Sequence, residues 1–180
     1  LGPCDKDVAQ IVARQIKKDG GEIHTKAMAK SWEERDGKAW VKADVKGKEM
    51  EFPADVVLVA VGRRPVTKGL DIEKSGVKLD ERGFIPVDAQ QRTNVPNIFA
   101  VGDVVGQPML AHKASHEGEV LAEVLAGHKA INDARTIPNV VFTEPEIASA
   151  GMGEEEAKAA GHAVRVGKFP FCLLYTSDAA

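Results

Sequence analysis

The pattern of hydrophobic and polar positions first predicts an amphipathic helix near the start of the chain. In the run VAQIVARQIKKDGG, apolar residues recur at helical spacing and would share one face, namely Val8, Ile11, Val12 and Ile16. Asp5 or Asp7 is a candidate N-cap, and the pair Gly20–Gly21 ends the pattern.

A second period, typical of β-strands, follows this helix. Residues 22–34 alternate loosely, and then come AWVKADV (39–45) and EMEFPA (49–54), separated by a Lys-Gly-Lys turn signal at 46–48. In the middle strand, one face would carry the apolar residues Val41, Ala43 and Val45. These segments predict a small antiparallel meander that is packed on one side and polar on the other.

Three further stretches predict strands. DVVLVAVG (55–62) is aliphatic throughout, which predicts a strand covered on both faces, as in a parallel sheet flanked by helices. GVKLDERGFIPVD (76–88) predicts a hairpin about its Asp-Glu-Arg-Gly turn. TNVPNIFAVGD (93–103) predicts a second apolar strand, which ends in Gly-Asp.

The rest of the chain predicts two helices and two strands. MLAHKASHEGEVLAEVLAG (109–127) has helical spacing, with a repeating face formed by Ala114, Gly118, Leu121 and Leu125. Gly127 stands at its C-cap position. Beyond a linker, 140–152 predicts a strand and a turn, 154–161 a short helix with an acidic start, and 162–171 another strand.

Composition narrows the class of function. The formal net charge is -3, with acids and bases interleaved, so the sequence carries no electrostatic footprint for nucleic acid or for a membrane surface. The longest apolar run, 56–62, is too short to span a bilayer, and we expect a cytoplasmic protein. Cys4 and Cys172 lie far apart, which favours a reducing compartment and does not form a closely spaced redox pair.

The junction between 93–103 and the following helix carries the main chemical signal. A strand that leads into a helix N-terminus directs free N–H groups and the positive end of the helix dipole at one place. Gly102 allows close approach there, and Asp103 offers two acceptors to hydroxyl groups. Taken alone, the pattern also fits an aspartate that caps a turn.

The histidines do not indicate a metal site. His112 and His116 are one helical turn apart, but no third ligand is apparent and Glu117 is expected to point elsewhere. We expect His112 to contribute through its backbone and not to act as a catalytic base.

Four motifs resemble a known family. TNVPNIFAVGD resembles the second flavin-binding signature of the two-dinucleotide-domain flavoprotein disulfide reductases, and DVVLVAVGRRP resembles the strand signature between their NAD and FAD segments. MLAHKASHEGEVLAEVLAG is similar to the dihydrolipoamide dehydrogenases in particular. IPNVVFTEPEIASAGMGEEEAKAAG resembles the first strand and helix of the shared dimerisation domain. The resemblance covers about Lys6 to Phe171 in the family's order.

The resemblance implies an α/β fold: a partial two-dinucleotide-binding-domain flavoprotein, with Rossmann-like parallel sheets and β-meanders, plus the start of an α/β dimerisation domain. It assigns residues 1–68 to the end of the NAD-binding domain, 69–135 to the second segment of the FAD-binding domain and 136–171 to the start of the dimerisation domain. Residues 172–180 resemble a translated sequencing adapter, and we expect them not to be native.

The same resemblance implies two cofactor sites. For FAD, Asp103 would accept hydrogen bonds from the ribityl hydroxyls, and the ring would lie on the amides of Met109, Leu110, Ala111 and His112. For NAD, Gly62 would lie beside the cofactor and Ala27 would make a backbone contact near the adenine. It implies no catalytic residue and no metal ligand within this sequence.

The implied parent is an FAD- and NAD-dependent dihydrolipoamide dehydrogenase. It would be a homodimer that oxidises dihydrolipoamide on a lipoyl-carrying protein of a 2-oxo acid dehydrogenase or glycine cleavage complex. The sequence contains no CxxxxC and no GxGxxG motif, so we expect these residues to be inactive alone. The alternatives are another disulfide reductase or a soluble transhydrogenase of the same architecture, or a non-catalytic nucleotide-binding fragment.

Overall fold

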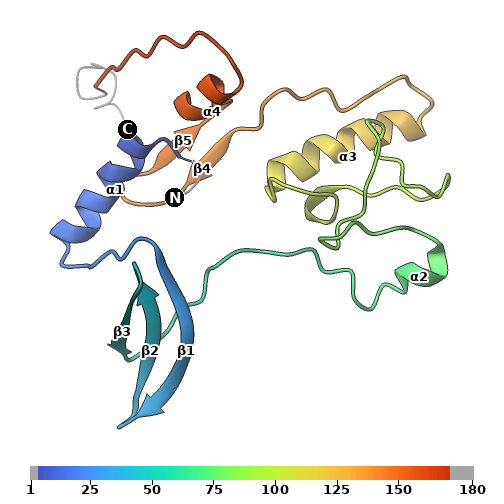
Figure 1. Ribbon diagram of the computed structural model, residues 1–180. Coiled ribbons are helices and arrows are strands. Elements are labelled where there is room, and N and C mark those ends of the chain that lie inside the picture. Colours follow the sequence, from blue (N-terminus) through green and yellow to red (C-terminus); the bar gives the residue numbers. More distant parts are fainter. Residues whose placement is uncertain (1–3, 171–180) are drawn as a thin grey trace. The chain divides into compact units, whose positions relative to one another are not determined.

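The computed structural model describes residues 4–170 of the 180 in the chain. They form two compact units, one made of residues 24–137 and the other of the described parts of 1–23 and 138–180 (Figure 1). The tail 172–180, which the sequence predicts to be non-native, lies outside the described residues. Within the described residues, no helix has the length and hydropathy that a membrane span requires.

The larger unit begins with the predicted meander, in which β1 (Ala27–Arg35), β2 (Lys38–Val45) and β3 (Lys48–Ala54) pair antiparallel in chain order (Figure 1). The two-residue turns between them have positive φ at both positions, a combination that matches the twist of the strands: Asp36 (53°), Gly37 (73°), Lys46 (55°) and Gly47 (84°). Ala43 and Val45 are buried, as the alternation predicts. The meander is therefore confirmed, although β1 begins five residues later than expected.

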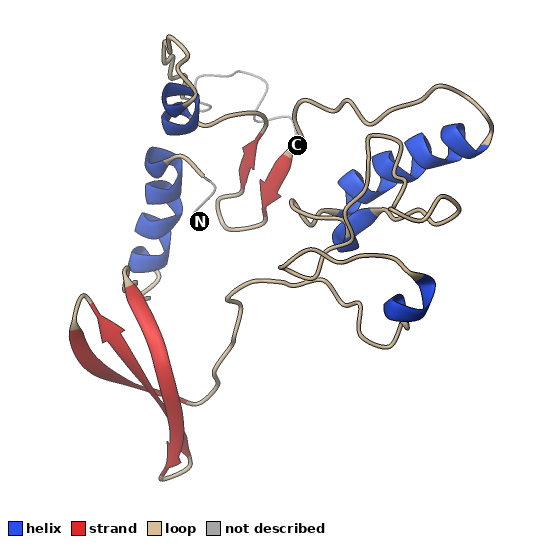
Figure 2. Ribbon diagram, turned by 45° about the vertical axis from the view of Figure 1, so that its right-hand side comes forward, coloured by secondary structure: helices blue, strands red, loops and turns tan. Residues whose placement is uncertain are grey.

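Downstream of β3, the larger unit consists of loops and turns around one long helix, α3 (Ala111–Leu125). The loops contain only the short helix α2 (Ile72–Ser75) and the 3₁₀ turn η1 (Gly102–Val104) (Figure 2). Apolar residues from the loops and from α3 form the core, namely Val77, Phe84, Ile85, Met109, Val120 and Val124. Backbone bonds between loops, such as Ile85 N–H to Val104 O at 2.9 Å, hold this part together.

The predicted strand at 55–62 is wrong. Among the described residues no strand pairs with it, and its side chains are exposed, by 89% for Leu58 and 93% for Val61. A strand that is apolar on both faces is stable only between neighbouring strands and beneath covering helices. The larger unit provides neither, so the segment runs as an extended loop.

The predicted hairpin at 76–88 and the predicted strand at 93–103 are also loops. Within the first segment the N–H of Asp80 donates to Phe84 O at 2.8 Å, and an isolated antiparallel bridge pairs Arg92 with Phe99 of the second. All strand pairing among the described residues is antiparallel, so the expected parallel sheets are not formed here.

Helix α3 is confirmed, but its buried face lies one residue away from the predicted one. Ala114, Gly118 and Leu121 are half-buried, and Leu125 is exposed. The buried stripe consists of Lys113, Glu117, Val120 and Val124. Two charged side chains, Lys113 and Glu117, are therefore buried, although the hydrophobic pattern predicts an apolar buried face.

The smaller unit contains α1 (Lys6–Lys18), the antiparallel hairpin of β4 (Asn139–Val141) and β5 (Ile147–Ser149), and α4 (Glu154–Ala159) (Figure 1). Both helices and the strand at β4 were expected from the sequence. Residues 162–170, predicted as a strand, form none. The core of this unit includes Val12 and Ile147.

Side chains from the start of α1 bind the later part of the smaller unit. Asp5 stands at the N-cap of α1 but makes no cap bond; its Oδ1 instead accepts a hydrogen bond from the backbone N–H of Glu154, at 3.1 Å. Asp7 pairs with Lys168, with 2.6 Å between Oδ2 and Nζ. Of the four apolar residues predicted for the helix face, Ile11 and Ile16 remain more than 40% exposed.

Candidate functional site

The junction that the sequence singles out is a buried, tightly packed turn. Gly102 is buried and has φ +84°, a conformation that disfavours any side chain. A Cβ at this position would lie 3.3 Å from Cβ of Ala114, so the chain meets α3 here at close range. At the end of η1 the N–H of Val105 donates to Gly102 O at 3.1 Å. Both the backbone conformation and the packing therefore require glycine.

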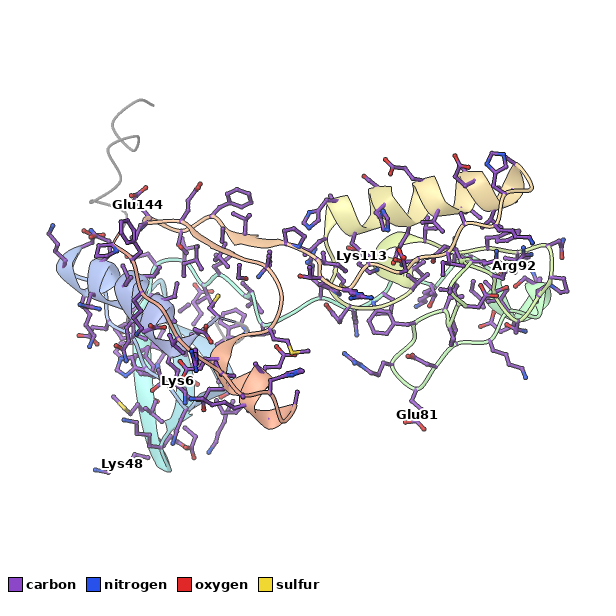
Figure 3. All side chains as sticks on the ribbon, turned by 90° about the horizontal axis from the view of Figure 1, so that it is seen from above. Lys6, Lys48, Glu81, Arg92, Lys113 and Glu144 are labelled. Carbon is purple, nitrogen blue, oxygen red and sulfur yellow. The ribbon has the colours of Figure 1, made fainter. Side chains whose placement is uncertain are left out.

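The buried charges of α3 hold this turn. Lys113 and Glu117 form an ion pair with 2.9 Å between Nζ and Oε1, and their side chains are only 8% and 4% exposed. Oε2 of Glu117 accepts a hydrogen bond from the N–H of Gly102 at 2.7 Å. Nζ of Lys113 donates to Gly102 O at 3.2 Å and to Gly106 O at 3.3 Å. Lys113 lies between α3 and the loops of its unit (Figure 3).

Sequence reasoning missed this pair. It expected Glu117 to point elsewhere, whereas the carboxylate points into the protein and binds the Gly102 turn. Charged residues on a helix are normally solvated, so a hydrophobic pattern assigns them to the outer face. The available signal was spacing, because Lys113 and Glu117 continue the stripe of Val120 and Val124 at steps of four, three and four.

Asp103, by contrast, is accessible. Its side chain is 52% exposed, and its Oδ2 lies 3.7 Å from Nη1 of Arg63. A second nitrogen of the same guanidinium donates a hydrogen bond to the carbonyl oxygen of Met109. Arg63 thus connects the segment after 55–62 with both Asp103 and Met109, which lies two residues before α3. Glu117 of α3, and not Asp103, supplies the buried carboxylate at the Gly102 turn, and the Asp103 side chain remains half-exposed.

The predicted FAD residues lie on one stretch around the start of α3. Met109 is buried, and its N–H donates a hydrogen bond to Oε1 of Gln107 at 3.3 Å. The N–H of Leu110 donates to Pro108 O at 3.1 Å. Ala111 and His112 are exposed in the first turn of the helix, where backbone N–H groups point along the axis. Arg63 and η1 place Asp103 beside this stretch.

The two predicted NAD residues are not part of this cluster. Gly62 is exposed, has φ +143° and immediately precedes Arg63. Ala27 is the first residue of β1, is exposed, and pairs with Val45 of the meander. Gly62 is connected to the residues around Asp103 through its neighbour Arg63, whose side chain contacts Asp103 and Met109.

The buried pair also borders a polar cavity of about 360 Å³. Lys113 and Glu117 line it together with Asp88, Gln91 and Asn132. Gln91 is 2% exposed, and its Oε1 has no hydrogen-bond partner within residues 4–170. No three His, Cys, Asp or Glu side chains in the described part of the chain are placed to hold a metal ion.

Comparison of the chain with known protein families gives two matches. Residues 1–118 match the family described as pyridine nucleotide-disulphide oxidoreductase, and residues 137–179 match the dimerisation domain of the same family. The chain belongs to the pyridine nucleotide-disulphide oxidoreductase family. The resemblance seen in the sequence is thereby confirmed, and β4, β5 and α4 fall within the dimerisation-domain match.

Individual relatives narrow the comparison. The chain is 49% identical to a dihydrolipoyl dehydrogenase of Bacillus subtilis (strain 168) over 93% of its length, and 50% identical to one of Geobacillus stearothermophilus over 95%. It spans about 36% of the length of these curated relatives. Among solved structures, the HOCl-induced flavoprotein disulfide reductase RclA of Escherichia coli matches 99% of the chain and 41% of its own, with TM-score 0.87 and 26% identity. LpdA of Mycobacterium tuberculosis matches 89% of this chain and 35% of its own, with TM-score 0.77 and 28% identity.

Proposed function

We propose that these residues are the part of an FAD- and NAD-dependent dihydrolipoamide dehydrogenase that extends from the end of the NAD-binding domain to the start of the dimerisation domain. The similarity to dihydrolipoyl dehydrogenases over 93% of the chain is the observation that supports it most. The domain boundaries proposed are those of the sequence: 1–68, 69–135 and 136–171, followed by the non-native tail 172–180.

The residues around Gly102 fit the sugar-like part of a flavin cofactor. Gly102 allows close approach of the backbone, and the half-exposed Asp103 carboxylate is an acceptor for ribityl hydroxyls. FAD would supply a two-electron carrier between a disulfide and NAD. The chain's own part is to hold that cofactor, with Asp103 accepting hydrogen bonds from its hydroxyl groups.

The start of α3 would stabilise negative charge on the flavin ring. Backbone from Met109 to His112 would lie against the ring, and the positive end of the α3 dipole would stabilise negative charge there. Such a dipole end contributes about 0.3–1 kcal/mol when exposed and up to about 2 kcal/mol when partly buried. For NAD, we propose contacts from Gly62 and Ala27, two residues that are exposed in the structure.

The partners proposed for the parent are those that the sequence resemblance implies. They are dihydrolipoamide on a lipoyl-carrying protein, a second copy of the chain to form a homodimer, and a 2-oxo acid dehydrogenase or glycine cleavage complex in the cytoplasm. The match of 137–179 to a dimerisation domain supports the homodimer. Neither nucleic acid nor a membrane is proposed as a partner.

Another disulfide reductase is the second candidate. The similarity in fold to RclA, a flavoprotein disulfide reductase, supports it. The sequence identity is 26% there, against 49% for the dihydrolipoyl dehydrogenase of Bacillus subtilis, so the proposal favours the dehydrogenase.

These residues alone are proposed to be inactive and to bind FAD weakly. The sequence has no GxGxxG loop, so the pyrophosphate of the cofactor lacks its usual backbone site. Assay of the purified chain with dihydrolipoamide and NAD should give no turnover. Turnover, or tight micromolar binding of FAD with yellow colour, would contradict this part of the proposal.

An NMR titration tests the site despite weak binding. FAD is added to the ¹⁵N-labelled chain up to concentrations suited to a dissociation constant of about 1 mM, which is about -4.1 kcal/mol. Amide shifts should move at Asp103 and in the first turn of α3. Asp103→Asn should weaken FAD binding about tenfold or more, since a hydrogen bond to a charged group contributes about 1.5–3 kcal/mol. Asp133→Asn, at an exposed aspartate, is the matched control. Scattered shifts, or equal effects of the two variants, would refute the site.

A further inference from the structure

The buried pair of α3 contacts the backbone at Gly102 on both sides. The N–H of Gly102 donates to Glu117, and the carbonyl of Gly102 accepts from Lys113. These two groups belong to successive peptide units, the ones before and after the Cα of Gly102. Holding both peptide planes fixes φ and ψ of a residue that, as glycine, has little conformational preference of its own.

The second of these peptide units leads directly into Asp103. Its carbonyl oxygen is the one that Lys113 binds at 3.2 Å, so the lysine fixes the plane from which the Asp103 backbone departs. Lys113 also binds Gly106 O at 3.3 Å and so joins both ends of the loop that contains Asp103. The direction in which the Asp103 side chain leaves the backbone is therefore set from α3.

The burial of the pair shows that it serves more than helix stability. An exposed Lys–Glu pair one turn apart on a helix adds little, and a buried pair must overcome the cost of removing both charges from water. Apolar residues at the same positions would extend the stripe of Val120 and Val124 without that cost. What the charges provide, and apolar side chains lack, is the set of bonds to the Gly102 turn.

We propose that Lys113 and Glu117 are positioning residues of the flavin site, which hold the Gly102–Asp103 peptide so that the Asp103 carboxylate faces the ribityl chain. The inference rests on the proposed function for its ligand, and on the four contacts of the pair for its mechanism. Neither side chain touches the cofactor in this scheme; both act through the backbone.

The test replaces the pair without burying a lone charge. The double variant Lys113→Met/Glu117→Met keeps side-chain volume and continues the apolar stripe, so α3 should stay folded, as circular dichroism and thermal unfolding will show. Without FAD, the amide of Gly102 should lose its hydrogen-bonded shift and exchange with solvent faster than in the wild type. If its shift and exchange rate remain those of the wild type, the proposal is overturned whatever FAD does.

A pair of single variants at Glu117 tests the same contact, and it can be used if the double variant fails to fold. Glu117→Gln keeps an acceptor for the N–H of Gly102, so the protection of that amide should be largely retained. Glu117→Met removes the acceptor and should lose it. If the two single variants expose the Gly102 amide equally, the side-chain acceptor does not hold the turn and the proposal is refuted.

The FAD titration separates this proposal from the function beneath it. In the double variant, FAD should bind about tenfold more weakly, and adding Asp103→Asn should have little further effect because Asp103 is already misplaced. An undiminished effect of Asp103→Asn in the stable double variant would show that the pair does not aim Asp103. If FAD induces no amide shifts in the wild type while the Gly102 amide still responds to the variants, the proposed flavin site is refuted. The role of Lys113 and Glu117 in fixing the Gly102 backbone is then retained.

Discussion

Arg63 and Asp103 form an ion pair, with 3.7 Å between Nη1 and Oδ2. Both side chains are more than half exposed, so the pair itself contributes little to stability. Its importance is geometric, because the same guanidinium also binds the carbonyl of Met109. One exposed side chain therefore ties the end of the apolar 55–62 segment to the turn before α3.

Removing this tie should loosen the site with a small loss of stability. Arg63→Ala should lower the free energy of unfolding by about 1 kcal/mol, mainly through the lost charged donor to the part-buried Met109 carbonyl. Urea unfolding measures the loss, and amide spectra should show changes at Asp103 and Met109. Arg64→Ala, the exposed neighbour, is the control and should change neither. Equal stability of the two variants would show that the contacts of Arg63 are not maintained in solution.

The same substitution at two glycines should have opposite effects. Gly102→Ala places a methyl group 3.3 Å from Cβ of Ala114 at φ +84° and should destabilise the chain by about 1–3 kcal/mol. Gly118→Ala, inside α3 with nothing within 4 Å of the added carbon, should stabilise it by about 0.5–1 kcal/mol. Thermal unfolding of both variants measures the two signs. A neutral Gly102→Ala would mean that the turn relaxes away from α3.

The contact between Asp7 and Lys168 should make the smaller unit sensitive to acid. The hydrogen bond from Lys168, followed by that from the Val8 N–H, lowers the pKa of Asp7 below its usual value of 3.8. The unfolded chain therefore binds a proton more readily, so this stabilisation is present above the unfolded pKa and is lost as the pH falls through the lower folded pKa. Lys168→Met should flatten the stability profile below about pH 4, measured by urea unfolding, whereas Lys17→Met should leave it unchanged. The amplitude will be small because both groups are exposed.

The exposed apolar segment should make the isolated chain prone to association. Contiguous exposed apolar surface of this kind promotes aggregation. Leu58→Lys together with Val61→Lys should raise solubility without loss of stability, because these side chains are 89% and 93% exposed. Light scattering against concentration measures the gain. Val45→Lys, at a buried position of the meander, should instead unfold the chain, and a similar loss in the double variant would show that 55–62 is packed in solution.

The parts of the fold that could be predicted are those whose signals are local. Helix α1, the meander and α3 follow from periods of a few residues and from turns such as Lys46–Gly47, which need no distant partner. The 55–62 segment has the composition of a central strand, but a strand also requires neighbours, and none of the described residues supplies one. Composition shows what a segment would tolerate, and pairing depends on the rest of the fold.

The candidate site divides in the same way. The run of Gly102, Asp103 and the start of α3 could be located because its residues are close in sequence. The partners of that run could not. Lys113 and Glu117 look like solvated charges until the helix is seen to turn them inward, and Arg63 is forty residues away from the carboxylate it meets.

The bond from the Glu154 backbone to Asp5 joins residues separated by 149 positions. During synthesis, α1 therefore precedes this partner by 149 positions and waits for it until they have been translated. A 13-residue helix is marginal in water by itself, so α1 will fluctuate during this time. The 24–137 unit is one continuous stretch between the two parts of the smaller unit, so it is translated before the smaller unit can be completed.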